Sequence, residues 1–207
     1  MKQILCYGDS NTWGLIPGTS ERFNWGVRWT SLIQEKLNQE EFHVIEEGLC
    51  GRTTIFEDVY RENRNGLKSL PLVLEAHSPI DYVILMLGTN DCKSHYKNNA
   101  YKIGKGLEQC LDKIIEFVSA DHILVISPIH LGESVWKQEF DPEFDQNSVG
   151  VSKNLSEAYK KIAERKGTHF LAASDYVGPS EADQEHMDAN SHQIFADAVY
   201  AAFKEMI

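Results

Sequence analysis

A serine in a small polar turn is the first candidate for chemistry in this chain. The apolar run Ile4–Tyr7 leads directly into Gly8-Asp9-Ser10-Asn11, so Ser10 could present a nucleophilic hydroxyl at the end of a strand. Small polar residues are also common in turns for structural reasons alone. Ser10 is therefore a candidate nucleophile only if the chain also supplies a base, an acid and donors for an oxyanion.

The other groups that acyl transfer needs occur later in the chain. His186 is a candidate base, because a neutral imidazole accepts a proton near pH 7, and Asp183 could orient its ring. The candidate oxyanion donors are the backbone N–H groups of Ser10 and Gly51 and the side-chain amide of Asn90. A glycine suits position 51 because it lets the backbone approach a substrate closely. Each residue alone is more typical of a turn or a surface, and their joint placement favours catalysis.

Five short apolar runs are the strands expected to position these groups. They are Ile4–Tyr7, Phe42–Glu47, Tyr82–Leu87, His122–Ser127 and His169–Ala172. The third and fourth are nearly continuous, which is typical of parallel strands covered on both faces. The candidate residues follow these runs, and in an open parallel sheet a site lies beyond the carboxyl ends of the strands.

Helical periodicity lies between and after the strands. It predicts helices around Trp29–Leu37, Ile103–Val118, Leu155–Ala163 and Ile194–Phe203, with Gly167 placed to end the third. Asn190 with Gln193 resembles a capping box for the last helix. A helix at Leu67–Ala76 is expected to be weaker, because Pro71 interrupts it. The alternation predicts a single α/β domain over residues 1–207, with three α/β/α layers around a five-stranded parallel sheet.

Composition narrows the classes of partner. The 207 residues include 20 Lys and Arg against 31 Asp and Glu, for a net charge of −11, which argues against nucleic acid and anionic membranes. The four cysteines form no CxxC pair, and the histidines form no HExxH motif, so no metal site is indicated. We find neither a signal peptide nor an apolar run long enough to span a membrane, and we expect a cytoplasmic protein.

Four short blocks resemble those of the SGNH, or GDSL-type, hydrolase family. In order they are Gly8-Asp9-Ser10, Gly51, Gly88-Thr89-Asn90-Asp91, and Asp183 with His186. The leucine that follows GDS in the family is replaced by Asn11, at a position that is not itself catalytic. The segments GDSNTWG, ERFNWGVRWTSLI, VIEEGLCGRTT and VILMLGTNDCK also resemble the arylesterase/acyltransferase branch of the family.

The resemblance implies a flavodoxin-like SGNH hydrolase fold and a serine esterase for short-acyl carboxylic esters. It implies Ser10, Asp183 and His186 as the catalytic residues and Ser10, Gly51 and Asn90 as the oxyanion hole. It also implies an acyl-enzyme, acyl transfer to alcohols in some members, and no cofactor or metal. The expected partner is a small-molecule ester, and members of the branch tend to form homo-oligomers.

Three weaker features adjoin these blocks. Trp13 could be a substrate-binding wall of the acyl pocket or could only pack against the strand. Arg52 and the two threonines after it are expected to hold the loop by hydrogen bonds. The segment 131–150 carries Trp136, Phe140 and Phe144; a lid or a surface loop is possible, and we favour an oligomer contact made by exposed aromatics.

Other functions stay open at this point. A carbohydrate O-acetyl esterase would use the same residues, whereas a lysophospholipase or thioesterase is less favoured because no long apolar acyl channel is evident. An α/β-hydrolase is disfavoured by the absence of GxSxG around Ser10. A non-catalytic binding module of the same fold is the alternative from a different class. A nucleotide-binding flavodoxin-like protein is disfavoured, because neither GxGxxG nor a P-loop occurs.

Overall fold

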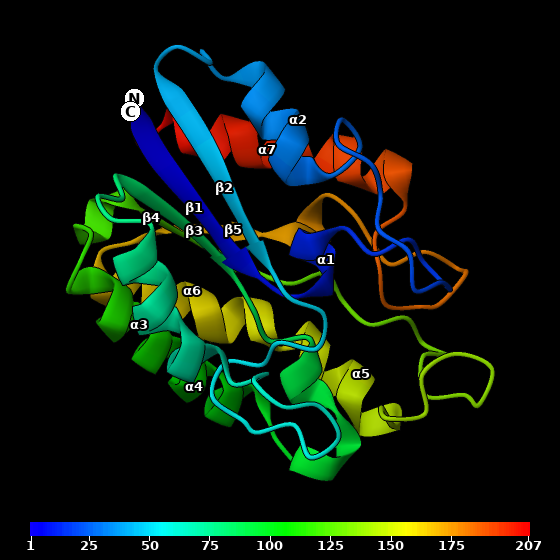
Figure 1. The fold of residues 1–207 in the computed structure, drawn as a ribbon. Coiled ribbons are helices and arrows are strands. Elements are labelled where there is room, and N and C mark those ends of the chain that lie inside the picture. Colours follow the sequence, from blue (N-terminus) through cyan, green and yellow to red (C-terminus); the bar gives the residue numbers. More distant parts are fainter.

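The five apolar runs form one parallel sheet in the computed structural model, which describes residues 1–207 (Figure 1). The strands are β1 (Lys2–Gly8), β2 (Phe42–Gly48), β3 (Tyr82–Met86), β4 (Ile123–Ser127) and β5 (His169–Ala172). Their order across the sheet is β2-β1-β3-β4-β5. Every residue of β3 and β4 is buried, as expected for strands covered on both faces. The predicted three-layer α/β fold is confirmed.

Helices cover both faces of this sheet. They are α1 (Ser10–Trp13), α2 (Trp29–Lys36), α3 (Gly66–Ala76), α4 (Ala100–Ile115), α5 (Gln146–Lys153), α6 (Leu155–Lys166) and α7 (Ala189–Lys204). Single 3₁₀ turns lie at Asn90–Cys92, Ser94–Tyr96, Ala120–His122 and Ala173–Asp175. Figure 1 shows α2 and α7 on one face and α3, α4 and α6 on the other. None of the helices combines the length and the apolar composition that crossing a bilayer requires.

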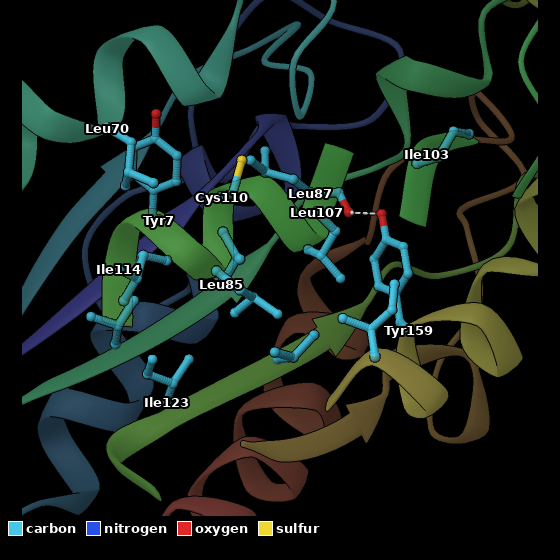
Figure 2. Close-up of a cluster of buried hydrophobic side chains, with 14 of the residues drawn as sticks. Tyr7, Leu70, Leu85, Leu87, Ile103, Leu107, Cys110, Ile114, Ile123 and Tyr159 are labelled. Carbon is cyan, nitrogen blue, oxygen red and sulfur yellow. Dashed lines mark hydrogen bonds between the residues drawn. The ribbon is translucent and has the colours of Figure 1, made fainter. Parts of the chain in front are cut away.

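Alternate residues of each strand supply two separate core layers. Under α2 and α7, Trp29 meets Phe195 edge to face, with ring centroids 5.4 Å apart. Under α3, α4 and α6, the strand residue Leu85 packs among Leu107 and other buried side chains (Figure 2). The Tyr159 hydroxyl in this layer donates to the carbonyl that follows β3, at 2.9 Å. Burying one aliphatic or phenylalanine side chain in either layer stabilises the fold by ~1.5–3 kcal/mol. The two layers together hold the sheet that carries the loops.

Two details of the helix ends bear on the predictions. The N-cap of α7 is Asp188, whose carboxylate accepts the N–H of Ser191, and not Asn190. Asn190 already lies inside the first turn, because Asp188 is the last residue with an extended backbone. Gly167 does end α6, with a positive φ of 71°, as its lack of a Cβ allows.

The predicted interruption at Pro71 is wrong, because α3 continues through this residue. The helix loses one backbone donor there. The loss is offset by Leu70 and Leu74, which are fully buried in the core. The side chain of Asn65 also caps the helix by accepting the N–H of Lys68 at 3.2 Å.

The segment 131–150 is more regular and more buried than an exposed aromatic loop. Its end forms α5, which begins with a capping box between Asp145 and Ser148. Phe144 is only 3% exposed and belongs to the core under α4 and α6. Trp136 is partly buried against the same core. The expectation of an oligomer contact built on exposed aromatics therefore loses its premise at Phe144.

Candidate active site

Four loops at one edge of the sheet bring together polar residues that are far apart in the sequence. Ser10 follows β1, Gly51 follows β2 and Asn90 follows β3. His186 lies between β5 and α7. All four line one cavity, so the carboxyl edge of the sheet is where the chain concentrates reactive groups.

A continuous series of hydrogen bonds joins a hydroxyl, an imidazole and a carboxylate. The Nε2 atom of His186 lies 2.8 Å from Ser10 Oγ, although 176 positions separate the two residues. The Nδ1 atom of the same ring lies 2.8 Å from Asp183 Oδ2. A carboxylate only accepts, so Nδ1 carries a proton and Nε2 is free to accept the proton of the Ser10 hydroxyl.

A tight turn explains how Asp183 reaches a ring only three residues later. Gln184 adopts a left-handed backbone, with φ of 63°. Asp183 Oδ1 accepts the N–H groups of Glu185 at 3.0 Å and His186 at 2.9 Å. The N–H of Gly18 donates to Oδ2 at 2.9 Å. The carboxylate is therefore fixed by three backbone donors in addition to its contact with the ring.

Asn11 links the turn that contains Ser10 to the loop that contains His186. It is buried, and its side-chain oxygen accepts the N–H of Met187 at 2.9 Å. Its backbone carbonyl accepts the indole N–H of Trp29 at 3.1 Å. The sequence marks Asn11 only as a departure from the GDS-Leu pattern, and a polar residue in a turn gives no sequence signal of a contact 176 positions away.

Three hydrogen-bond donors remain for a substrate. The backbone N–H groups of Ser10 and Gly51 donate to no acceptor in the protein. The side-chain amide of Asn90 donates one hydrogen to the carbonyl of Arg52 at 3.2 Å, which leaves its second hydrogen for the cavity. Gly51 has a φ of 83°, a left-handed conformation that favours glycine. A Cβ there would also displace the end of the flexible Arg61 side chain, whose nitrogen would lie 2.7 Å away.

Buried polar contacts hold in place the loop that follows β2 and carries Gly51. The Arg52 guanidinium donates to the carbonyls of Gly8, at 2.8 Å, and Glu47. Asp91 accepts the backbone N–H of Thr54 at 3.0 Å and also its hydroxyl. These contacts link the ends of β1, β2 and β3, so the expectation that Arg52 and its neighbours hold the loop is confirmed.

The cavity is small and mostly polar. It encloses about 190 Å³. Besides the four loop residues, its lining consists of Leu15, Cys50, Arg61, Lys93, Asp141, Glu143 and Glu185. Trp13 is not part of this lining, because its ring packs beneath Arg22, with the guanidinium carbon 5.3 Å from the ring centroid. The structure thus shows the packing contact that the sequence left open, and the substrate-binding role of Trp13 stays a prediction without support from the cavity lining.

Comparisons with known proteins identify the family of this chain. A model of the GDSL-like lipase/acylhydrolase family matches residues 6–194. The chain belongs to this family. It is similar to the structures of a carbohydrate acetylesterase from Sinorhizobium meliloti, at 31% identity with TM-score 0.90, and an M. smegmatis aryl esterase, at 29% identity with TM-score 0.89. Each similarity covers 100% of both chains. No curated protein sequence matches the chain.

This GDSL-family protein is therefore a carboxylic ester hydrolase.

The charges around His186 favour the protonated form of its ring. Burial alone would lower the pKa of His186, but the carboxylates of Glu185, Asp183 and Asp9, with the hydrogen bond to Asp183, outweigh it and raise that pKa. Burial also acts to raise the pKa of Asp183, yet its bonds to the His186 ring and to backbone N–H groups hold it below the usual range. The contact between His186 and Asp183 therefore stabilises an imidazolium on His186 and a carboxylate on Asp183.

Glu185 is a second residue of the candidate site, after Asn11, that the sequence did not reveal. In the sequence it stands beside Asp183 as Glu181 does, and both glutamates resemble solvated acids of a polar loop. Glu181 is exposed, but Glu185 is only 7% exposed and lines the cavity. A loop has no hydrophobic periodicity from which to read burial, so the sequence contains no signal that separates the two acids.

Proposed function

We propose that the chain is a serine esterase for short-acyl carboxylic esters, with Ser10 as nucleophile, His186 as general base and acid, and Asp183 as the group that orients His186. The observation that carries this proposal is the unbroken series of hydrogen bonds from Asp183 through His186 to Ser10. The same three roles define serine hydrolysis on several unrelated folds.

In the first half of the reaction, the Ser10 oxygen bonds to the ester carbonyl carbon while its proton passes to His186 Nε2. The carbonyl oxygen becomes an oxyanion, which the free N–H groups of Ser10 and Gly51 and the amide of Asn90 would bind. The bond to the alcohol then breaks. The alcohol leaves with the proton from His186, and the acyl group stays on Ser10.

In the second half, His186 takes a proton from an incoming hydroxyl, whose oxygen attacks the acyl carbon. The bond to the Ser10 oxygen breaks, and that oxygen recovers a proton from His186. Attack by water completes hydrolysis, and attack by an alcohol gives acyl transfer. The same residues would serve both outcomes, since only the attacking group differs.

The cavity supports a short acyl group attached to a small or polar alcohol. A space of about 190 Å³ leaves little room for a long alkyl chain, and only two of the eleven lining residues, Leu15 and Cys50, are hydrophobic. The charged lining also favours a hydroxyl-rich alcohol, because buried charges require hydrogen-bonding partners. A carbohydrate O-acetyl esterase is therefore the second candidate, and one similar structure is of a carbohydrate acetylesterase.

A panel of esters tests the proposal. It comprises 4-nitrophenyl esters from acetyl to octanoyl and fully acetylated sugars. We expect kcat/KM to fall as the acyl chain lengthens, because a longer chain exceeds the cavity, and we expect acetate release from the sugars. Octanoyl esters cleaved faster than acetyl esters would contradict the short-acyl assignment. Inactivity towards acetylated sugars would leave aryl and simple alkyl esters as the substrates.

The pH dependence of kcat/KM follows from the charges around His186. Only the neutral imidazole can accept the Ser10 proton, so activity falls as the pH drops through the pKa of His186. The surrounding carboxylates raise that pKa, so we expect the midpoint of the acidic limb above the ordinary value of about 6.5. Initial rates with 4-nitrophenyl acetate at low substrate concentration, from acid to mildly alkaline pH, measure it. A midpoint below the ordinary value would contradict the described electrostatics.

A further inference from the structure

The Glu185 carboxyl group lies next to the reacting atoms but has no role in the mechanism above. Its Oε1 atom is 3.8 Å from His186 Nε2, the nitrogen that exchanges protons with Ser10. The side chain is 8% exposed and lines the same cavity as Ser10, Gly51 and Asn90. Most of the side chain is therefore hidden from solvent, and what remains faces the reaction.

The ion-pair contact of the Glu185 carboxyl group is with His186 Nε2, and its 3.8 Å separation from Oε1 is too long for a hydrogen bond. Lys93, the nearby cation in the cavity, forms its ion pair with Glu143 instead. A buried carboxylate without a donor is costly, and native structures normally satisfy such groups with protein or water. In this cavity, water and the hydroxyl groups of substrates can both donate to Glu185.

The charged groups that face Glu185 set when it is ionised. Burial raises its pKa to about 7, with Asp141 and Asp183 also raising it and His186 and Lys93 acting in the opposite direction. Above neutral pH the side chain is thus mainly a carboxylate, which can only accept hydrogen bonds. Assays above neutral pH therefore report on the carboxylate form of Glu185, which accepts hydrogen bonds.

We propose that Glu185 selects water over monohydric alcohols as the group that attacks the acyl-enzyme, and so directs the reaction to hydrolysis. This inference rests on the proposed function, because it requires an acyl group on Ser10 and a base at His186. It names Glu185 as the residue that sets the partition between hydrolysis and transfer.

Water and a monohydric alcohol differ in the number of hydrogens that the attacking oxygen carries. Two acceptors 3.8 Å apart can both lie within ~2.8 Å of one oxygen. A water molecule there donates one hydrogen to His186 Nε2 and the other to Glu185. A monohydric alcohol has a single hydroxyl hydrogen, which His186 must receive, so the alcohol has no hydrogen left to donate to Glu185.

The proton balance of deacylation is the same in both cases. The attacking oxygen forms a bond to the acyl carbon, and its proton passes to Nε2. The bond between that carbon and the Ser10 oxygen then breaks, and Ser10 takes the proton back. With water, the hydrogen that is not transferred stays hydrogen-bonded to Glu185 throughout, so the carboxylate helps to hold the nucleophile while gaining no proton itself.

The test is the product ratio from one acyl-enzyme with two acceptors. Wild type and Glu185→Met are given 4-nitrophenyl acetate with increasing 1-propanol at mildly alkaline pH, and acetic acid and propyl acetate are both quantified. Methionine is unbranched and apolar, so it fills similar space without accepting from water. We expect the ratio of transfer to hydrolysis to rise roughly tenfold, as losing a hydrogen bond to a charged group implies. The ratio does not depend on how fast the acyl-enzyme forms.

Glu181→Met is the matched control, because Glu181 is an exposed acid on the same loop, and its ratio should equal that of wild type. If Glu185→Met does not fold, Glu185→Gln replaces it. An amide oxygen accepts less strongly than a carboxylate, so a smaller rise in the same direction is expected. An unchanged or lower ratio in the Glu185 variant overturns this inference, even if its total rate falls. A wild-type chain that releases no nitrophenolate overturns the proposed function as well.

Discussion

Replacing Ser10 by alanine is expected to reduce turnover of 4-nitrophenyl acetate by on the order of 10⁶-fold, the scale seen when a serine hydrolase loses its nucleophile. Alanine removes the only atom at this position that can bond to the acyl carbon. The loss should appear as the absence of the initial burst of nitrophenolate and of an acetylated protein in the mass spectrum. His186 and the oxyanion donors remain, so weak residual hydrolysis by bound water is still expected.

A matched serine separates this chemical effect from a general effect of the substitution. Ser20 is exposed in the loop that follows α1, and Ser20→Ala should retain the wild-type burst and rate. Both variants should melt at temperatures near that of wild type, because the Ser10 hydroxyl bonds only to His186 Nε2. A normal burst in Ser10→Ala would show that another residue is the nucleophile and would end the proposed mechanism.

Replacing Asp183 by asparagine is expected to lower kcat by ~10⁴, the effect of the same change in a serine protease. The new amide can keep its oxygen towards the N–H groups of Glu185 and His186, which Asp183 Oδ1 accepts now. Its NH₂ group then faces His186 Nδ1, so the proton of the neutral ring moves to Nε2. A protonated Nε2 cannot accept the Ser10 proton, and the ring becomes inactive without leaving its place.

The Asp183→Asn variant is measured by the rate of the burst and by the steady-state rate at several pH values. Asp175→Asn is the control, since Asp175 is an exposed acid between β5 and the site, and it should behave as wild type. The substitution at Asp183 should also remove the hydrogen bond from the N–H of Gly18 to Oδ2, which loosens the neighbouring loop. An activity within tenfold of wild type would exclude Asp183 as the orienting group.

The sheet could be predicted from the sequence because its strands are buried on both faces. Continuous apolar runs such as those of β3 and β4 have few alternatives in a chain of this size. The residues at which strands end are harder to predict from the sequence, because backbone pairing and not composition decides them. Gly8, for example, still pairs in the sheet with Gly48, although it begins the polar turn in the sequence.

The helices that the sequence missed or misjudged were decided by local polar contacts and by tertiary packing. The start of α5 depends on the box of hydrogen bonds between Asp145 and Ser148, in a segment without apolar periodicity. The continuity of α3 depends on core packing that outweighs the missing donor of Pro71. Neither effect can be read from a propensity, because each depends on how the neighbouring chain folds.

The members of the site could be named from the order of the four blocks along the chain and the rule that places loops at one sheet edge. The contacts among these residues could not be predicted from the sequence. Asn11 and Glu185 lie in turns where a polar residue is ordinary, and only the folded backbone buries both beside His186. Trp13 shows the opposite case, since a large aromatic near the nucleophile packs beneath Arg22 instead of entering the cavity.

The pairing of the first and last parts of the chain has a consequence for biosynthesis. During translation Ser10 precedes its partner His186 by 176 positions, and His186 is held beside α7, which docks on α2. A nascent chain therefore contains Ser10 and its turn well before it contains the imidazole that would activate the hydroxyl. Activity of the proposed site therefore requires that α7 has docked on α2, so its appearance would report on the packing of that helix.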